Sequence, residues 1–300
     1  MNLFPISFCI DEGKIVKETP RLKKHAFASL IPGDMSTYTF QSEAVYNQHY
    51  SDSFYAFTWK KAGWDCMRHY EIIAAGCMPF FPDLPQCPPN TMTNFPKHLI
   101  LEAMALPGIN VSSRTIDFTV FPIDRYYELL DQLLSYARTH LTSKVAAKRV
   151  LDICNFDASE ESTTKLVYYN CRLPDYQSLM ILQGLKQLLG SRCISTPNDG
   201  YLYDDFTEAQ AQALPSGKGF NYTRMVPAIF KTSQEDFNRA IADPEKENIT
   251  LVIFGKCHWD HEPHESLKLI EKVFICGEDL HDCHFIRDPN RTCKLFVREL

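Results

Sequence analysis

The chain has 300 residues and a mass of 34.5 kDa, about twice the length of an average domain, which favours two domains with a large core. Hydrophobic residues make up 45% and charged residues 23%, which excludes the disordered and fibrous classes. The whole formal net charge of −6 falls on residues 156–300, so neither half has the excess of Lys and Arg that nucleic-acid binding requires.

The first residues and the cysteines bear on the compartment. The start, MNLFPISF, lacks a basic region, and no apolar run approaches the roughly 20 residues that span a bilayer, so we expect neither a signal peptide nor a transmembrane segment. The 11 cysteines form no C-x-x-C pair, and Cys66, Cys77, Cys154 and Cys276 lie in apolar stretches. We interpret them as reduced core thiols of a cytoplasmic protein.

In the first half, short apolar runs alternate with helical patterns. The expected strands cover 25–31, 53–58 and 77–81, and the helices between them cover 42–50 and 64–75. This β-α-β-α-β rhythm predicts a parallel sheet with crossover helices, as in a Rossmann-like domain. Three more helices are expected at 97–106, 123–137 and 139–152.

The polar stretch 156–164 is the expected linker. After it, strands are expected at 166–170, 193–195, 249–257 and 272–276, and helices at 178–189 and 234–243. The predicted fold is therefore α/β, with two Rossmann-like domains, residues 1–156 and 164–300, facing each other across a cleft. Ligands of such sheets bind outside the carboxyl ends of the strands.

The segment after the second strand suits a phosphate group. The strand ends at Thr58, Lys60 and Lys61 follow, Gly63 lets the backbone turn closely, and a helix opens at Trp64. Backbone N–H groups at a helix start, together with two ammonium groups, would bind a diphosphate. The alternative is that both lysines are simply solvated in a loop.

Within that helix, Trp64, Arg68 and Glu71 fall on one stripe. A phosphate near Arg68 and a ribose diol near Glu71 would form a coherent nucleotide site. The alternative is a solvated ion pair between Arg68 and Glu71, which would contribute a few tenths of a kcal/mol.

The run K-K-x-G-W-D-x-x-R-H-Y-E-I-x-A-x-G-C-x-P-F-F-x-D-L over residues 60–84 resembles the donor-nucleotide segment of exostosin-like GT-B glycosyltransferases of bacteria and large DNA viruses. The resemblance implies that Glu71 holds the ribose and that Lys61 and Arg68 hold phosphate. It also implies close backbone approach at Gly63. With the residues discussed above, we expect the donor site to comprise Tyr38, Thr58, Lys60, Lys61, Gly63, Trp64, Arg68 and Glu71.

The second half resembles the acceptor-side domain of the same family, in the pieces 173–190, 201–206, 217–223, 276–283 and 294–300. In those relatives the piece like 294–300 runs directly into the piece like 2–8, so the acceptor-type domain comes first. The resemblance therefore implies a circular permutation of the two domains, which is tolerated where chain ends are close and exposed.

The general base of an inverting transferase has several candidates. Asp175 lies in the first strand-to-helix loop of the second half, where inverting GT-B enzymes commonly keep a base. The same residue is well suited to cap the following helix, and we weigh base and cap equally. Asp260 and Asp279, the latter beside Glu278, also follow expected strands and are alternatives.

Two further features are weaker. Cys257, His258, Asp260, His261 and His264 are metal-ligand types in a short span, but their spacing matches no zinc motif and Pro263 breaks the helix that would align them. We therefore expect no metal site and no cofactor. Tyr38 and Phe40, after the first strand, could stack on the donor base, although core packing is the commoner role of such residues.

The predicted function is metal-independent transfer of a pentose or hexose from a UDP-sugar donor to a hydroxyl of an oligosaccharide or glycoprotein glycan. The resemblance adds a viral capsid glycan as acceptor and the host cytoplasm as location. The expected partners are thus a UDP-sugar and a glycan, without nucleic acid. The alternatives are a non-catalytic nucleotide-sugar or glycan-binding protein of the same fold, and a zinc hydrolase built on residues 257–264.

Overall fold

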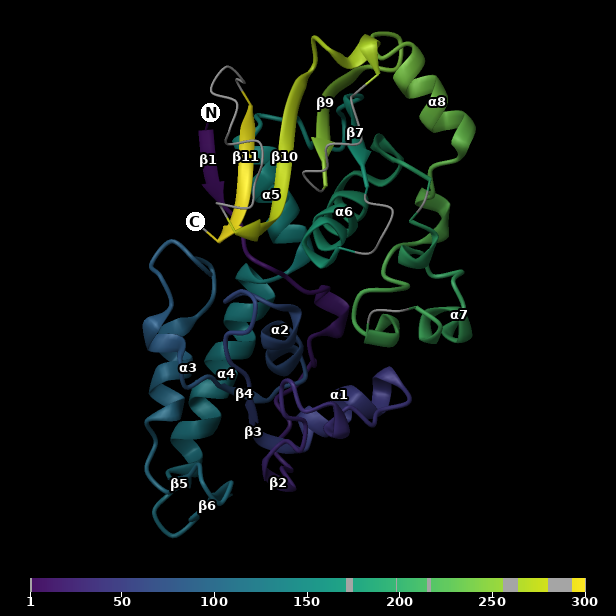
Figure 1. Cartoon of the computed structure of the whole chain (residues 1–300). Helices are drawn as coiled ribbons and strands as arrows, with labels where there is room; N and C mark the ends of the chain where they lie inside the picture. Colours follow the sequence, from purple (N-terminus) through teal and green to yellow (C-terminus); the bar gives the residue numbers. More distant parts are fainter. Residues whose placement is uncertain are drawn as a thin grey trace.

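The computed structural model describes residues 2–170, 175–197, 199–214, 217–255, 264–279 and 293–299. They form a mixed α/β structure with two parallel sheets, which lie toward opposite ends of the view in Figure 1. The predicted α/β class with parallel sheets is confirmed. No helix among these residues is both long and apolar enough to cross a membrane.

The smaller sheet follows the rhythm expected in the first half. Its strands are parallel and lie in the order β2 (His25–Phe27), β3 (Ser53–Phe57) and β4 (Met78–Phe80). The crossovers are α1 (Glu43–Ser51) and α2 (Met67–Ala74). Every residue of β3 and β4 is buried, as is typical of a parallel sheet covered on both faces.

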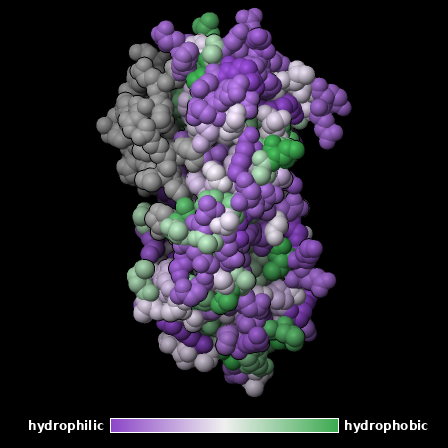
Figure 2. Space-filling view, turned by 90° about the vertical axis from the view of Figure 1, so that its right-hand side faces the viewer, coloured by the Kyte–Doolittle hydropathy of each residue, from purple (hydrophilic) through white to green (hydrophobic). Residues whose placement is uncertain are grey.

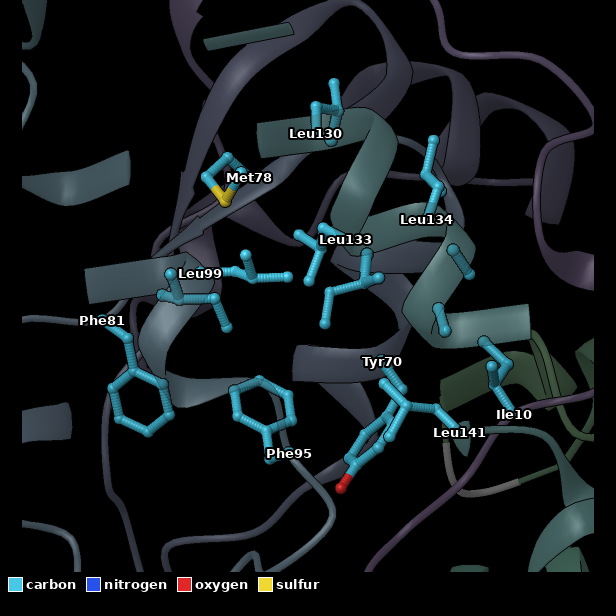
Figure 3. Packing of buried hydrophobic residues seen from close by; sticks show 14 of the residues in the cluster. Ile10, Tyr70, Met78, Phe81, Phe95, Leu99, Leu130, Leu133, Leu134 and Leu141 are labelled. Carbon is cyan, nitrogen blue, oxygen red and sulfur yellow. The ribbon is translucent and has the colours of Figure 1, made fainter. Parts of the chain in front are cut away.

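Two helices complete this half. They are α3 (Lys97–Met104) and α4 (Ile123–His140), with the hairpin β5 (Ile109–Asn110) and β6 (Thr115–Ile116) between them. Figure 3 shows leucines of α4 converging with Met78 of β4 and Leu99 of α3. The helical spacing of those leucines places them on one buried face of α4.

The larger sheet has six parallel strands. Their order is β1 (Asn2–Pro5), β11 (Lys294–Glu299), β10 (Glu271–Asp279), β9 (Ile249–Phe254), β7 (Lys165–Tyr169) and β8 (Cys193–Ser195). Helices α5 (Ser143–Ile153) and α6 (Tyr176–Leu189) pack together beside it, and α7 (Glu208–Gln212) and α8 (Gln234–Ala242) follow.

The two sheets do not follow the expected division at residues 156–164. Strand β1 lies at the edge of the larger sheet, and Ala147, Val150 and Leu151 of α5 belong to the core beside that sheet. Both ends of the first half therefore pack with the second half. The strands β1 and β11 were not expected from sequence periodicity.

The chain ends bear on the proposed permutation. Strands β1 and β11 are parallel neighbours, with Asn2 opposite Lys294, so the chain begins at the amino ends of the strands and finishes at their carboxyl ends (Figure 1). Parallel strands need a crossover of a dozen or more residues. A direct link from β11 into β1 therefore has no support in this geometry.

The cysteines differ in state. Cys66, Cys77 and Cys154 are free thiols, as expected, and burial raises the pKa of Cys77 to about 12. Cys276 is disulfide-bonded, so the prediction of a reduced thiol was wrong for this residue. An apolar sequence context indicates burial, but only the folded chain decides whether two Cβ atoms lie about 3.8 Å apart.

Candidate functional site

A cleft of about 610 Å³ lies where the carboxyl ends of the two sheets meet. From the smaller sheet it is lined by Tyr38 after β2, Lys61 after β3 and Arg68 in the first turn of α2. From the other half it is lined by Tyr176 at the start of α6 and Arg298 near the end of β11. This is the edge at which parallel α/β sheets bind ligands.

The N-terminus of α2 borders the cleft without a side-chain cap. The N-cap residue, Cys66, makes no capping hydrogen bond through its side chain, whose Sγ lies 3.4 Å from Nε2 of the His69 ring. Cys66, Met67 and Arg68 all line the cleft. The first N–H groups of a helix have no partner within it, and the helix dipole adds a partial positive charge. The site is therefore chemically suited to an anion.

Arg68 carries a full charge into the same place. Its Nη2 donates to the Tyr38 hydroxyl at 2.7 Å, and its guanidinium lies 5.4 Å from the centre of the Tyr38 ring. Its buried Nε has no hydrogen-bond partner among the described residues. Within that part of the chain, no ion pair joins Arg68 to Glu71, so the alternative of a solvated pair is not what the structure has.

Glu71 lies on the same face of α2 and also lines the cleft. Its Oε2 accepts a hydrogen bond from the Tyr46 hydroxyl at 2.7 Å, and its Oε1 accepts one from Nδ2 of Asn221 at 3.1 Å. Burial raises the pKa of Glu71, while these two hydrogen bonds oppose the shift. A carboxylate oxygen that accepts one such bond still has a lone pair for a further donor.

The two lysines of the expected site differ in their position relative to the cleft. Lys61 lines the cleft, whereas Lys60 is exposed outside it, with its Nζ 5.9 Å from the centre of the Trp64 ring. The Lys60 backbone N–H donates to Asp83 at 3.0 Å, which anchors the loop away from the cleft. Of the two ammonium groups, only that of Lys61 is placed to meet a ligand there.

Thr58 and Trp64 support the loop from behind rather than lining the cleft. The buried His69 ring contacts both residues, with Nδ1 at 2.8 Å from the Thr58 hydroxyl and Nε2 at 2.8 Å from the Trp64 carbonyl. Burial lowers the pKa of His69, so the ring is neutral, with Nε2 donating and Nδ1 accepting. This brace fixes the path of residues 58–64.

Gly63 lines the cleft and allows another group to come close to its backbone, as expected. The group that comes close is β11 of the same chain and not a ligand. A Cβ on Gly63 would collide with the Glu299 carboxylate at the end of β11 and would lie 3.0 Å from Nη2 of Arg298. The glycine therefore lets β11 reach the α2 loop, where the Asp65 N–H donates to Glu299 at 3.1 Å.

Asp65, Lys218 and Arg298, which line the cleft, and Asn221, which contacts Glu71, are among the residues of the site that were not predicted from the sequence. Arg298 donates to the Asp65 carbonyl oxygen, and its buried Nε has no hydrogen-bond partner among the described residues. Burial raises the pKa of Asp65 to about 6, although the Phe8 N–H donates to its Oδ2 at 2.8 Å. These contacts join distant segments, so no local pattern could have identified them.

The aromatic residues that follow β2 line the cleft, and one of them also packs against α1. Tyr38 and Phe40 both line it, and the Phe40 ring lies 5.5 Å from that of Tyr46 and 4.8 Å from that of His49. Packing therefore accounts for one side of Phe40. Stacking of a donor base on Tyr38 stays a prediction.

Of the candidates for the catalytic base, the described residues include the side chain of Asp175. The Asp175 side chain caps α6 by accepting from the Ser178 N–H at 2.8 Å, while its neighbour Tyr176 lines the cleft. Asp260, the Asp279 side chain and residues 257–263 of the proposed zinc cluster lie outside the described residues. His264 is described, and its Nδ1 lies 2.8 Å from the Ser266 hydroxyl.

Three wider observations concern the surface, metal binding and similarity to known proteins. On the face shown in Figure 2, the coloured surface is mostly hydrophilic, with hydrophobic residues in small scattered groups. In the described ranges, no group of three or more His, Cys, Asp and Glu side chains could hold a metal ion. Comparison with known protein families, curated proteins and solved structures found no match to this chain.

Proposed function

We propose that the protein is a GT-B-type glycosyltransferase that binds a nucleoside diphosphate sugar, with UDP as the nucleotide, in the cleft. One observation carries the proposal. At the carboxyl ends of two parallel sheets, a single helix presents an uncapped N-terminus, the Arg68 guanidinium, whose Nε is unpartnered among the described residues, and the carboxylate of Glu71 to the same cleft. An anion site followed one turn later by a hydrogen-bond acceptor matches a diphosphate followed by a ribose.

In this proposal, the diphosphate lies against the start of α2, between Lys61, Arg68 and Arg298. These cations and the helix dipole stabilise the charge that develops on the departing diphosphate, which takes the place of a metal ion. Glu71 accepts hydrogen bonds from the ribose hydroxyls. The base lies on the aromatic side of the cleft, beside Tyr38 and Phe40.

The acceptor glycan is proposed to enter from the side of the larger sheet, where α6 begins. As the acceptor oxygen bonds to the anomeric carbon, the bond from that carbon to the diphosphate breaks and the hydroxyl proton passes to a base. Asp175 is the proposed base, because it lies next to the cleft-lining Tyr176. Its cap to Ser178 holds the carboxylate at the end of α6 nearest the cleft.

The first test is UDP binding by titration calorimetry, comparing Arg68→Ala with Lys60→Ala. Both changes remove one positive charge from the same segment, but only Arg68 lines the cleft. We expect Arg68→Ala to weaken UDP binding by about 10-fold to 100-fold, the range for lost hydrogen bonds to a charged group, with Lys60→Ala near wild type. Equal affinities in both variants would contradict the phosphate assignment.

The second test separates transfer from binding alone. A panel of UDP-sugars is incubated with the protein and mixed glycan acceptors, and UDP release is measured. Release that depends on the acceptor supports the transferase. UDP-sugar binding without acceptor-dependent release would support the non-catalytic binding protein instead.

A further inference from the structure

The segment 218–224 comes from the second half but reaches the part of the cleft built by α1 and α2. Lys218 and Phe220 line the cleft, and the Lys218 Nζ donates to the Phe40 carbonyl at 3.0 Å and to Gln41 Oε1 at 2.9 Å. A donor site was expected in the first half alone. The cleft instead includes side chains from a segment about 150 residues further along the chain, the separation between Glu71 and Asn221.

The backbone of this segment is held in an uncommon conformation. Lys218, Asn221 and Arg224 have φ values of 52°, 61° and 60°. Asn tolerates this left-handed region, whereas Lys and Arg are strained there by roughly 1–2 kcal/mol each. Such strain persists only where surrounding contacts hold the chain in place. Contacts with the rest of the protein must therefore hold this segment in its conformation.

Asn221 makes several of the contacts that hold the segment, and it is only 1% exposed. Its Nδ2 donates to Glu71 Oε1 at 3.1 Å and to Asn47 Oδ1 at 3.2 Å, and its Oδ1 accepts from the Asn47 amide at 3.1 Å. Its backbone N–H donates to Glu43 Oε2 at 3.2 Å. One buried amide thus joins the segment to both α1 and α2 and uses both of its N–H donors.

We propose that Asn221 is a positioning residue of the nucleotide site: it orients the Glu71 carboxylate for the ribose hydroxyls and docks Lys218 and Phe220 against the bound nucleotide. This inference rests on the proposed function. With Tyr46 on Oε2 and Asn221 on Oε1, the carboxylate is held at both oxygens while Glu71 still lines the cleft. The second half therefore takes part in donor recognition as well as acceptor binding.

The test reverses the hydrogen bond between Asn221 and Glu71. Asn221→Asp keeps the size of the side chain and tolerates a positive φ, but it removes the donor and faces Glu71 and Glu43 with a third carboxylate. When Asn221→Asp is combined with Glu71→Gln, the amide introduced at position 71 can donate to the carboxylate introduced at position 221, which restores one bond in the opposite direction. Asn238→Asp, on the exposed face of α8, is the control for added charge.

UDP affinity is measured in a double-mutant cycle, with hydrogen exchange of residues 218–224 as a second readout. We expect Asn221→Asp to weaken UDP binding about tenfold or more in the wild-type background and less than about twofold in the Glu71→Gln background. Exchange in the segment should rise in Asn221→Asp and return toward wild type in the double variant. The Asn238→Asp control should match wild type in both readouts.

Four results would overturn the proposal. An equal loss of affinity in both backgrounds would mean that Asn221 does not act through Glu71. A lower melting temperature with unchanged UDP affinity would make Asn221 a purely structural residue. A wild-type protein that binds no UDP would overturn the proposed function and this inference together, whereas normal UDP binding with an unaffected Asn221→Asp variant would overturn this inference alone.

Discussion

At the scale of single residues, the site combines side chains that meet a ligand with side chains that hold others in place. Arg68 and Glu71 line the cleft directly, whereas Thr58 acts through His69 on the carbonyl of Trp64. Asp65 belongs to both groups, because it lines the cleft and its side chain is also buried in the protein. Substitution of a residue that meets the ligand should therefore mainly change ligand affinity, whereas substitution of a supporting residue should mainly change the stability of the fold.

Asp65 predicts a pH dependence of stability. Its pKa is raised by burial to about 6, above the ordinary 3.8, so the folded state binds its proton more tightly than the unfolded state does. This stabilisation is present below the unfolded pKa and is lost as pH rises from about 4 to 6, by up to about 3 kcal/mol. Asp65→Asn should gain stability relative to wild type over that window. Urea unfolding at several pH values measures this, and a pH-independent difference would exclude it.

Asp175 can be tested as base and as cap separately. Asn caps a helix as well as Asp does, whereas Ala at the N-cap costs about 1 kcal/mol. If Asp175 is the base, Asp175→Asn should keep its stability and lose acceptor-dependent turnover by about 10²-fold or more. Asp175→Ala should lose both, and UDP affinity should stay unchanged in each variant. Full activity in Asp175→Asn would show that the residue is a cap only.

At the scale of elements, close packing of α5 against α6 fixes the position of the α6 N-terminus at the cleft. Gly184 of α6 lies directly against the Ser143 backbone, and a Cβ at Gly184 would collide with that carbonyl and lie 2.8 Å from the Ala147 Cβ. The absence of a side chain lets the two helices approach. Helix α6 thereby places Asp175 and Tyr176 at their observed position.

Gly184→Ala should therefore destabilise the fold. Overpacking against backbone atoms costs roughly 1–3 kcal/mol, because the helices must separate. Gly200→Ala is the matched control, since nothing lies within 4 Å of the Cβ that it would add. Thermal and urea unfolding of the two variants compares them. Equal stability in Gly184→Ala and wild type would show that α5 and α6 separate at no cost.

At the scale of the whole molecule, the cleft uses the carboxyl ends of both sheets. Lys61 and Arg68 come from the smaller sheet, while Arg298 comes from β11 of the larger one. A ligand bound there contacts segments that are far apart in the chain. Binding should therefore be visible in both halves.

We expect UDP to slow hydrogen exchange in residues 58–71 and 293–299 together. Contact with both sheet edges suppresses local opening in each, and a ligand at 100 times its Kd stabilises the fold by about 2.7 kcal/mol. Arg298→Ala should weaken UDP binding and remove the protection at 293–299 selectively. Protection confined to 58–71 would mean that the larger sheet does not contact the nucleotide.

Local pattern was enough to predict much of the first half. The strands at 53–58 and 77–81, the helix carrying Arg68 and Glu71, and the leucine face of α4 all follow from periodicities that neighbouring residues set. The sequence also predicted that Arg68 and Glu71 share one face of a helix. Residues three apart lie on the same side of any helix, whatever surrounds it.

The tertiary structure alone decided which distant segments meet. It placed β1 in the larger sheet, put Arg298 and Asn221 beside α2, and turned Thr58 and Lys60 away from the cleft. Periodicity specifies which face of an element is apolar, but not which other element covers it. That choice depends on how all the apolar faces of the chain are buried at once, so the sequence by itself determined the elements and the folded chain determined the site.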